Sequence, residues 1–314
     1  EAGAARIPHD HDLTLGYADY FGLKVDSFYP QDGYYTNYFG NTRSLIPAEE
    51  FLEGRPWEGS VKHKEYSKIL GGTDQLPKAF FDSLVEDVHF SNDVLFIDQT
   101  QDDIVVKVSD GTEYTCDYII CTVPLPVLNM IEFSPPLSNE KMDASNGGYY
   151  YAPSTRVFIQ FKNRFWENDG LNGWGYTDWP EEIWQPSWNR DGTKGILLSY
   201  LRYEQATDID LLPENDRIEN VINRWENIFP GAQSNIDTGL SFSWMEENWS
   251  RGAWASPSEE QNELYSSHIG KTEGRVYFAG EHTTEYHGWM QGALQSGIRA
   301  AEGIHYGDYF GQLV

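Results

Sequence analysis

The alternation of apolar and polar residues predicts a β-hairpin followed by a buried strand. Residues 104–108 and 112–116 both alternate, and they flank Asp110-Gly111, a dipeptide favoured in tight turns. The apolar run at 118–121 follows at once, and such a short continuous run is typical of a strand buried on both faces. We therefore expect three consecutive strands here, the last of them fully buried.

The middle of the chain has the same strand-like spacing, and two other stretches have helical spacing. Residues 157–161 and 196–200 alternate and predict further sheet. Residues 76–80 predict a short helix, and residues 218–229 repeat with helical spacing. Near the end, the apolar residues 275–280 predict a strand that runs into a glycine. Strands and helices alternating in this way favour a mixed α/β fold.

The charge of the chain excludes several classes of partner. The chain has 314 residues and a formal net charge of −27. A field of this sign repels phosphate backbones and anionic headgroups, so we expect no nucleic-acid and no membrane partner. No apolar run approaches the ~20 residues of a membrane-spanning helix, which favours a soluble protein, cytoplasmic or secreted. Cys116 and Cys121 lack the spacing and the histidines of a zinc site, so no metal is predicted.

The strongest chemical signal is a strand followed by a glycine-rich helix. Residues 275–280 deliver Glu281 to the carboxyl end of a strand, and such ends face ligand crevices in α/β sheets. In the helix expected from about Gly288 to Ile304, Gly288, Gly292 and Ser296 recur every four residues. One helix face therefore has almost no side chains, and a flat ring or another backbone can lie against it. Close helix packing explains the same spacing without any ligand.

This segment resembles the C-terminal signature of the flavin-containing amine oxidases, a family that includes monoamine, polyamine and L-amino-acid oxidases. The resemblance lies in Phe278-Ala279-Gly280-Glu281-His282-Thr283 and His287-Gly288-Trp289-Met290-Gln291-Gly292-Ala293. It implies FAD as cofactor, with Glu281 on the ribityl chain. It also implies that Gly288 and Trp289 border the substrate. Trp289 would form one wall of the substrate site and is a predicted catalytic residue. The implied cofactor contacts in these segments are Val94, Glu281, Gly288, Trp289, Met290, Gln291, Gly292 and Ala293.

The opening residues resemble the amino-acid-oxidase branch of the family. They are Glu1-Ala2-Gly3-Ala4-Ala5-Arg6-Ile7-Pro8, and the resemblance implies that Gly3, Ala4, Ala5 and Arg6 pass the flavin. It also implies that Arg6 pairs with the substrate carboxylate and that Tyr200 adds a hydrogen bond to the same group. A planar guanidinium offers two parallel donors to a carboxylate, which suits this role. Considered alone, Arg6 would be a surface charge and Tyr200 a packing residue.

Three features depart from the family pattern. The chain contains no G-x-G-x-x-G motif, so the strand–turn–helix that binds the cofactor's pyrophosphate is expected before Glu1. We therefore expect tight FAD binding to need that segment, attached or supplied as a separate chain. Residues 49–68 leave room for at most a loop in place of the helical insertion of L-amino-acid oxidases. Arg156 stands at the position of a catalytic lysine that water bridges to the flavin N5, and an arginine exchanges protons less easily.

These inferences predict an α/β (α+β) fold, with a split FAD-binding domain and an inserted, mostly antiparallel β-sheet substrate domain. We assign residues 1–68 and 147–265 to the substrate domain, and residues 69–146 and 266–314 to the FAD domain. The predicted reaction is oxidation of an L-amino acid by oxygen to a 2-oxo acid, ammonia and hydrogen peroxide, with noncovalent FAD. One alternative is an amine or polyamine oxidase, and another is a non-catalytic remnant that binds no FAD. Homo-oligomerisation stays open.

Overall fold

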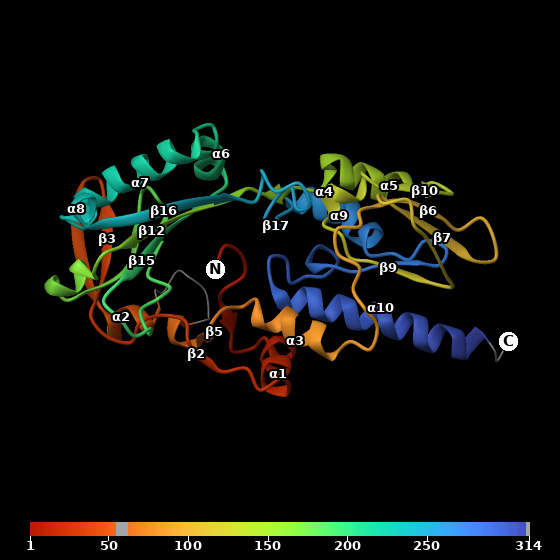
Figure 1. Ribbon diagram of the computed structural model, residues 1–314, viewed down its shortest axis with the longest axis horizontal. Helices are drawn as coiled ribbons and strands as arrows, with labels where there is room; N and C mark the ends of the chain where they lie inside the picture. Colours follow the sequence, from red (N-terminus) through yellow and green to blue (C-terminus); the bar gives the residue numbers. More distant parts are fainter. Residues whose placement is uncertain (55–61, 312–314) are drawn as a thin grey trace. The chain divides into compact units, whose positions relative to one another are not determined.

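The computed structural model describes residues 1–54 and 62–311 (Figure 1). The chain divides into two compact units, each assembled from three separate segments. Unit 1 consists of residues 1–11, 18–75 and 153–244. Unit 2 consists of residues 12–17, 76–152 and 245–314.

A seven-stranded sheet forms the centre of unit 1, in the order β16-β12-β15-β14-β13-β3-β4. Every neighbouring pair is antiparallel except β13 and β3, which are parallel. Gly40 and Asn41 both have positive φ at the β3–β4 turn, as a two-residue hairpin loop requires. The strands are β3 (Tyr34–Phe39), β4 (Thr42–Pro47), β12 (Ser154–Phe161), β13 (Leu171–Thr177), β14 (Glu182–Trp184), β15 (Gly195–Arg202) and β16 (Ile236–Ser243).

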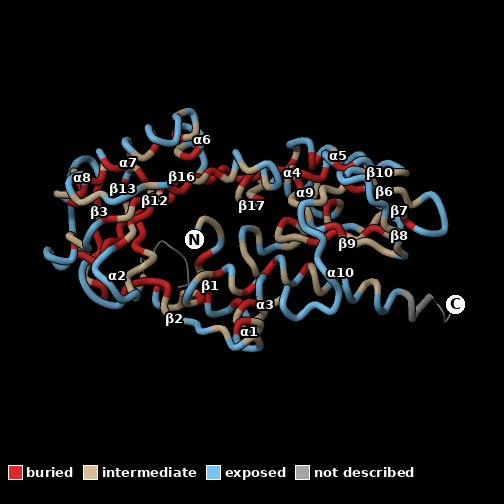
Figure 2. The backbone as a smooth tube through the Cα atoms, viewed as in Figure 1, coloured by how far each residue is buried: buried red, intermediate tan, exposed pale blue. Residues whose placement is uncertain are grey.

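Helices cover one face of this sheet and leave the other face for polar residues. Val157 and Ile159 of β12 pack with Val221 and Trp225 of α7 in one apolar core, whose buried positions are visible in Figure 2. Because side chains alternate along a strand, Arg156 of β12 points to the opposite face. The covering helices are α6 (Glu204–Asp210), α7 (Glu214–Ile228) and α8 (Ala232–Asn235).

A smaller antiparallel sheet, in the order β1-β5-β2, and three short helices complete unit 1. The segment expected to replace the family's helical insertion contains α2 and ends in β5, and its residues 55–61 lie outside the described part of the chain. Within it, His63 is buried and stacks on Phe51 with ring centroids 4.3 Å apart. The elements are β1 (Ile7–Pro8), β2 (Val25–Ser27), α2 (Ala48–Leu52), η1 (His63–Glu65), β5 (Tyr66–Ile69) and η3 (Phe165–Asp169).

Unit 2 contains three sheets, in the orders β10-β6-β7-β8, β11-β17 and β18-β9. The predicted hairpin at residues 104–116 is confirmed as β7 and β8. The fully buried strand predicted at residues 118–121 is wrong in its burial: β9 pairs only with β18 among the described strands, and Ile120 is 38% exposed. The strands are β6 (Val94–Asp98), β7 (Ile104–Val108), β8 (Glu113–Cys116), β9 (Ile119–Cys121), β10 (Glu132–Ser134), β11 (Tyr151–Ala152), β17 (Trp254–Ala255) and β18 (Val276–Phe278).

The helices of unit 2 include the glycine-rich helix expected near the end of the chain, α10. It begins at Met290 rather than Gly288, because Gly288 has a φ of 75°, which a right-handed helix does not allow. It continues to Gly311, beyond the expected end at Ile304. The helices are α1 (Asp12–Tyr20) and α3 (Gln75–Ser83), which cross the unit boundary, and α4 (Leu125–Leu128), α5 (Asn139–Asp143), η2 (Ala144–Gly148), α9 (Glu259–Ile269), η4 (Glu281–Thr283) and α10 (Met290–Gly311).

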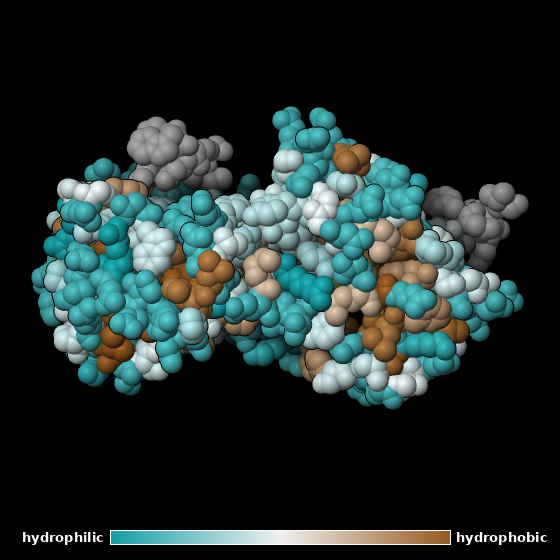
Figure 3. Space-filling view, turned by 90° about the horizontal axis from the view of Figure 1, so that it is seen from above, coloured by the Kyte–Doolittle hydropathy of each residue, from teal (hydrophilic) through white to brown (hydrophobic). Residues whose placement is uncertain are grey.

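Mixed parallel and antiparallel sheets with interspersed helices confirm the predicted α/β class. Hydrophilic residues dominate the surface in the view of Figure 3, as the net charge of −27 leads one to expect. None of the helices in residues 1–54 and 62–311 combines the length and the apolar character needed to cross a bilayer.

Candidate active site

Strand register brings three polar side chains into one row on the open face of the large sheet. Arg156 of β12 lies directly opposite Tyr200 of β15, and Tyr200 lies opposite Glu182 of β14. All three residues are buried. Trp184 stands two residues after Glu182 and therefore on the same face of the sheet. The row lines up an arginine, a phenol and a carboxylate across neighbouring strands.

Arg6 joins this row from the loop before β1. Its Nη1 lies 3.8 Å from Glu182 Oε2 and donates a hydrogen bond of 3.5 Å to the Tyr29 hydroxyl. Glu182 also accepts from Arg202 Nη2 at 2.9 Å and from Trp184 Nε1 at 2.7 Å. Burial alone would lower the pKa of Arg6 and raise that of Glu182, but their mutual attraction reverses both shifts. Both groups are therefore charged at neutral pH.

Aromatic rings separate the arginines of this cluster. The guanidinium carbons of Arg6 and Arg156 lie 5.2 and 5.0 Å from the centroid of the Trp184 ring. Arg156 and Arg202 lie 4.4 and 4.9 Å from the centroid of the Tyr200 ring. Ring faces attract cations, so Trp184 and Tyr200 stabilise guanidinium groups that would otherwise repel one another. We call Arg6, Arg156, Glu182, Tyr200 and Arg202 the arginine cluster.

Arg156, which is predicted to have a catalytic role, is buried in unit 1. Its Nη1 donates to the Glu1 carbonyl at 2.5 Å, and burial lowers its pKa from the ordinary value of arginine. Its Nε is buried and has no hydrogen-bond partner among the described residues. A buried donor without an acceptor is costly, so this N–H marks a place where a ligand or water acceptor would be stabilised.

The other predicted residues of the first segment lie beside the cluster. Trp244 Nε1 donates to the Ala2 carbonyl at 2.7 Å, and a Cβ added at Gly3 would lie 3.0 Å from the Trp244 ring. Ala4 is exposed, whereas Ala5 is buried and lines a cavity. The close approach of Trp244 explains why position 3 has a residue without a side chain.

The remaining predicted residues belong to unit 2, where Glu281 organises the loop before α10. Its Oε1 accepts from the Ala255 N–H at 3.0 Å, and its Oε2 accepts from the Gly288 N–H at 2.6 Å. Burial raises the pKa of Glu281, and these two backbone bonds partly offset that shift. Each carboxylate oxygen accepts more than one hydrogen bond, so Glu281 keeps capacity for hydroxyl donors of a ligand.

The small-residue face of α10 packs against the protein itself at Gly292 and Ser296. A Cβ added at Gly292 would lie 2.5 Å from Thr284 Oγ1 and 2.7 Å from the Tyr286 carbonyl oxygen. Ser296 Oγ accepts from the Gly280 N–H at 2.8 Å. Gln291 is buried, and its amide oxygen accepts from the Thr14 N–H and its amide nitrogen donates to Asp12. Gln291 therefore anchors the start of α1.

The other predicted residues of this half are less enclosed. Trp289 and Met290 are half-buried, and Ala293 is exposed. Val94 begins β6 opposite Val108, where the β6–β7 ladder shifts its register. His287 Nε2 lies 3.1 Å from the Tyr149 hydroxyl, which ties the loop before α10 to the core of unit 2. Arg6, Arg156 and Tyr200 are thus brought together in unit 1, and Glu281, Gly288 and Trp289 form a second group in unit 2.

Sequence reasoning did not identify Glu182, Trp184 or Arg202 as site residues. Glu182 follows another glutamate, Glu181, and such a pair is usually solvated. Only the pairing of β14 with β15 places Glu182 inside and leaves Glu181 with 44% of its side chain exposed. All three residues of β14 are buried, so an alternation of apolar and polar residues could not reveal that Glu182 and Trp184 share a face.

Comparison with known proteins identifies relatives over most of the chain. A sequence model of the family of flavin-containing amine oxidoreductases matches residues 55–305. The L-amino-acid oxidase of Vipera ammodytes ammodytes is 28% identical over 263 residues, which cover 78% of this chain and 54% of the relative. A putative L-amino-acid oxidase of Bacillus subtilis is 34% identical over 250 residues, which cover 75% of this chain and 52% of the relative. The chain thus spans about half the length of the curated relatives it matches.

Solved structures of two amine oxidases share the fold. Putrescine oxidase bound to putrescine matches with a TM-score of 0.81 at 16% identity, over 96% of this chain and 88% of that chain. Cyclohexylamine oxidase from Brevibacterium oxydans matches with a TM-score of 0.81 at 12% identity, over 96% of this chain and 87% of that chain. The resemblance noted in the sequence and the predicted fold class are both confirmed.

Proposed function

The chain belongs to the family of flavin-containing amine oxidoreductases, and from this premise we propose that the protein oxidises L-amino acids. An L-amino acid, oxygen and water would give a 2-oxo acid, ammonia and hydrogen peroxide. The arginine cluster is the observation that favours an amino acid over a plain amine as substrate. Two guanidinium groups, those of Arg6 and Arg202, lie 3.8 and 2.9 Å from one buried carboxylate, that of Glu182, and a third, that of Arg156, lies 4.4 Å from the centroid of the Tyr200 ring.

FAD fits the residues available to it. Glu281 begins η4 just after β18 and has acceptor capacity left for ribityl hydroxyls, and the half-buried Trp289 offers an indole to a planar ring. Arg156 offers an unpaired buried N–H to an acceptor, directly or through water. We propose noncovalent FAD, because the sequence from Glu281 to Trp289 contains no cysteine that could form a thioether. The bound FAD would supply an acceptor for the hydride of the substrate's α-carbon and a route for the electrons to oxygen.

Arg6 is the residue that we expect to bind the substrate carboxylate. Its Nη1 is engaged by Tyr29 and Glu182, and no hydrogen bond from Nε or Nη2 is found within the described residues. One edge of the guanidinium therefore stays available for a carboxylate. The Tyr200 hydroxyl, across the same face, would add a donor. Together they would orient the α-carbon, and the oxidation itself would need no strong side-chain base.

The experiment compares amino acids with amines. Holoenzyme from the whole protein should be yellow and should release hydrogen peroxide with L-amino acids faster than with amines of the same chain length. Decarboxylated analogues, such as phenethylamine against L-phenylalanine, isolate the contribution of the carboxylate. Faster turnover of the amines would favour an amine or polyamine oxidase. A colourless protein that takes up no FAD would favour a non-catalytic remnant.

A further inference from the structure

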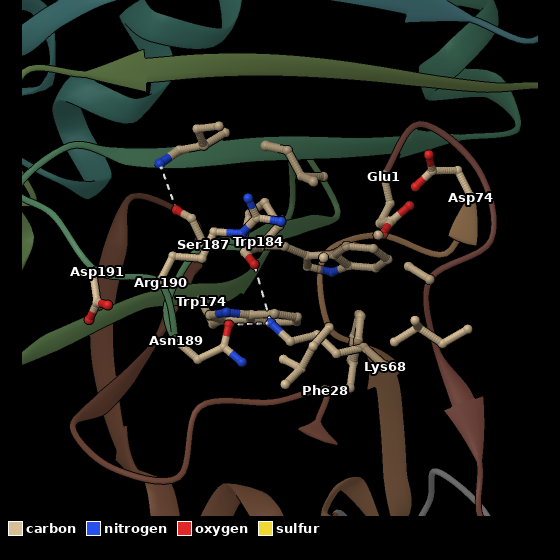
Figure 4. A pocket seen from close by; sticks show the side chains of 18 residues that line it. Glu1, Phe28, Lys68, Asp74, Trp174, Trp184, Ser187, Asn189, Arg190 and Asp191 are labelled. Carbon is tan, nitrogen blue, oxygen red and sulfur yellow. Dashed lines mark hydrogen bonds between the residues drawn. The ribbon is translucent and has the colours of Figure 1, made fainter. Parts of the chain in front are cut away.

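A cavity of about 760 Å³ lies in unit 1 next to the arginine cluster (Figure 4). The two sites share Trp184, whose ring lines the cavity and also meets the guanidinium of Arg6. Ala5, the neighbour of Arg6, lines it as well. Its volume is within the range of small-molecule sites. A substrate whose α-carboxylate is bound at Arg6 therefore has a cavity beside it that can receive its side chain.

One wall of the cavity is aromatic and rigid. Trp174 and Trp184 stack with ring centroids 5.6 Å apart and planes 15° from parallel. Phe28 meets both indoles edge-on, with ring centroids 5.1 and 5.2 Å away. Ile196 and Leu198 of β15 extend this apolar surface. Such a wall packs well against a methylene chain and leaves recognition to the polar groups around it.

Lys68 brings a fixed ammonium group to the cavity. Its Nζ donates to Asn189 Oδ1 at 2.9 Å and to the Pro186 carbonyl at 3.2 Å. The Asn189 amide donates in turn to Asp26 Oδ2 at 2.9 Å, so the acceptor is itself held in place. No carboxylate of the described residues comes within ion-pair distance of Lys68. An ammonium group has three N–H donors, so one is left for a ligand.

Arg190 adds a second cation to the same cavity and likewise has no ion-pair partner in residues 1–54 and 62–311. Burial lowers the pKa of Lys68 to about 8; Asp26 opposes the shift and Arg190 adds to it, as a like charge nearby must. Glu1 and Asp74 lie on the side of the cavity away from Asn189 (Figure 4). Asp191 lines the cavity on the same side as Arg190 but forms no ion pair with it in the described part of the chain. An anion at the Lys68 end would reduce the repulsion between the two cations.

We propose that this cavity receives the side chain of the substrate and that Lys68 and Arg190 bind a carboxylate at its end. The preferred substrates are then dicarboxylic L-amino acids, held at one carboxylate by Arg6 and at the other by Lys68 and Arg190. This inference rests on the proposed oxidation of L-amino acids. Binding does not depend on oxidation, because a dicarboxylic acid without an amino group, such as glutarate, presents the same two anions.

The test compares wild-type holoenzyme with Lys68→Met on L-aspartate, L-glutamate and L-2-aminoadipate, with L-glutamine as the neutral counterpart of L-glutamate. Wild type should prefer one of the three acids to L-glutamine. Lys68→Met should lower kcat/KM for that acid by roughly tenfold or more, mainly through KM, and change it for L-glutamine by less than about threefold. Lys194→Met removes an exposed lysine that is paired with Asp237, and it should leave both substrates unaffected.

Two outcomes separate this inference from the proposed function. If L-glutamine is the better substrate, or if Lys68→Met slows both substrates equally, the inference is wrong while amino-acid oxidation stands. If no amino acid is oxidised, the proposed function is wrong, and the anion site is then tested by the binding of two acids, glutarate and pentanoate. Glutarate should then raise the unfolding midpoint of wild type more than pentanoate does, and Lys68→Met should remove that difference. No difference between the two acids in wild type would contradict the anion site.

Discussion

Arg6 and Glu182 face each other across 3.8 Å in the buried part of unit 1, although 176 positions separate them in the chain. Glu182 is 4% exposed and accepts two further hydrogen bonds, from Arg202 and Trp184. The carboxylate thus holds two guanidinium groups that would otherwise repel each other. It also leaves part of the positive charge uncompensated, and that residual charge is what an anionic substrate group would use.

Glu182→Gln should be strongly destabilising. The change removes a charge from a buried pair and leaves Arg6 and Arg202 without their common anion, which typically costs about 3–5 kcal/mol. Denaturant unfolding of the variant and wild type measures the difference. Glu181→Gln is the matched control, because Glu181 contacts the same Arg202 with 44% of its side chain exposed, and it should cost under about 1 kcal/mol. Equal losses in the two variants would show that burial of Glu182 has no special role.

Arg6→Met should reduce activity on amino acids selectively. Methionine keeps an unbranched stem beside Trp184 but removes the guanidinium that we expect to bind the substrate carboxylate. Transition-state binding of L-amino acids should weaken by about 2–5 kcal/mol, read from kcat/KM. Decarboxylated analogues should lose far less, because they have no carboxylate to bind. An equal loss of kcat/KM on both substrate types would contradict the proposed role of Arg6 in binding the carboxylate.

The sequence predicts this fold best where the signal is local. The β7–β8 hairpin follows from alternation around Asp110-Gly111. Glu182 shows the limit, because its burial depends on the register between β14 and β15, which joins distant segments. The true start of α10 depends on the positive φ of Gly288, which a sequence motif does not reveal.

The residues of the candidate site also divide into those that the sequence could reveal and those that only the structure shows. Arg6 and Tyr200 could be singled out through the family resemblance, and the structure places both in one cluster with Arg156. Their roles toward substrate stay predictions. Lys68 could not be found from the sequence, because a lysine in a short strand is usually solvated. Its importance comes from the cavity and from the fixed acceptor, Asn189, that hold its ammonium group.

Lys141 should make the stability of the chain depend on pH in the alkaline range. Its side chain is fully buried in unit 2 and lies 3.4 Å from Glu273, and burial lowers its pKa from 10.5 to about 8 in spite of that partner. Between these two values the unfolded chain binds a proton that the folded chain does not, so folding becomes more favourable as the pH rises. Relative to Lys141→Met, wild type should gain roughly 3 kcal/mol of unfolding free energy from pH 8 to 10.5. A constant difference between the two proteins would contradict the shift.

Gly292→Leu should destabilise unit 2 and impair the retention of flavin together. Thr284 and Tyr286 leave no room for a side chain at position 292, so a leucine must displace the loop that leads to Trp289. Overpacking of this kind costs about 1–3 kcal/mol or more. Gly297→Ala is the control in the same helix, since a Cβ there meets no described atom within 4 Å and alanine favours helix by up to ~1 kcal/mol. The measurements are thermal unfolding and the ratio of flavin to protein absorbance. If Gly292→Leu keeps a wild-type ratio, the loop before α10 does not contribute to flavin binding, whatever its effect on stability.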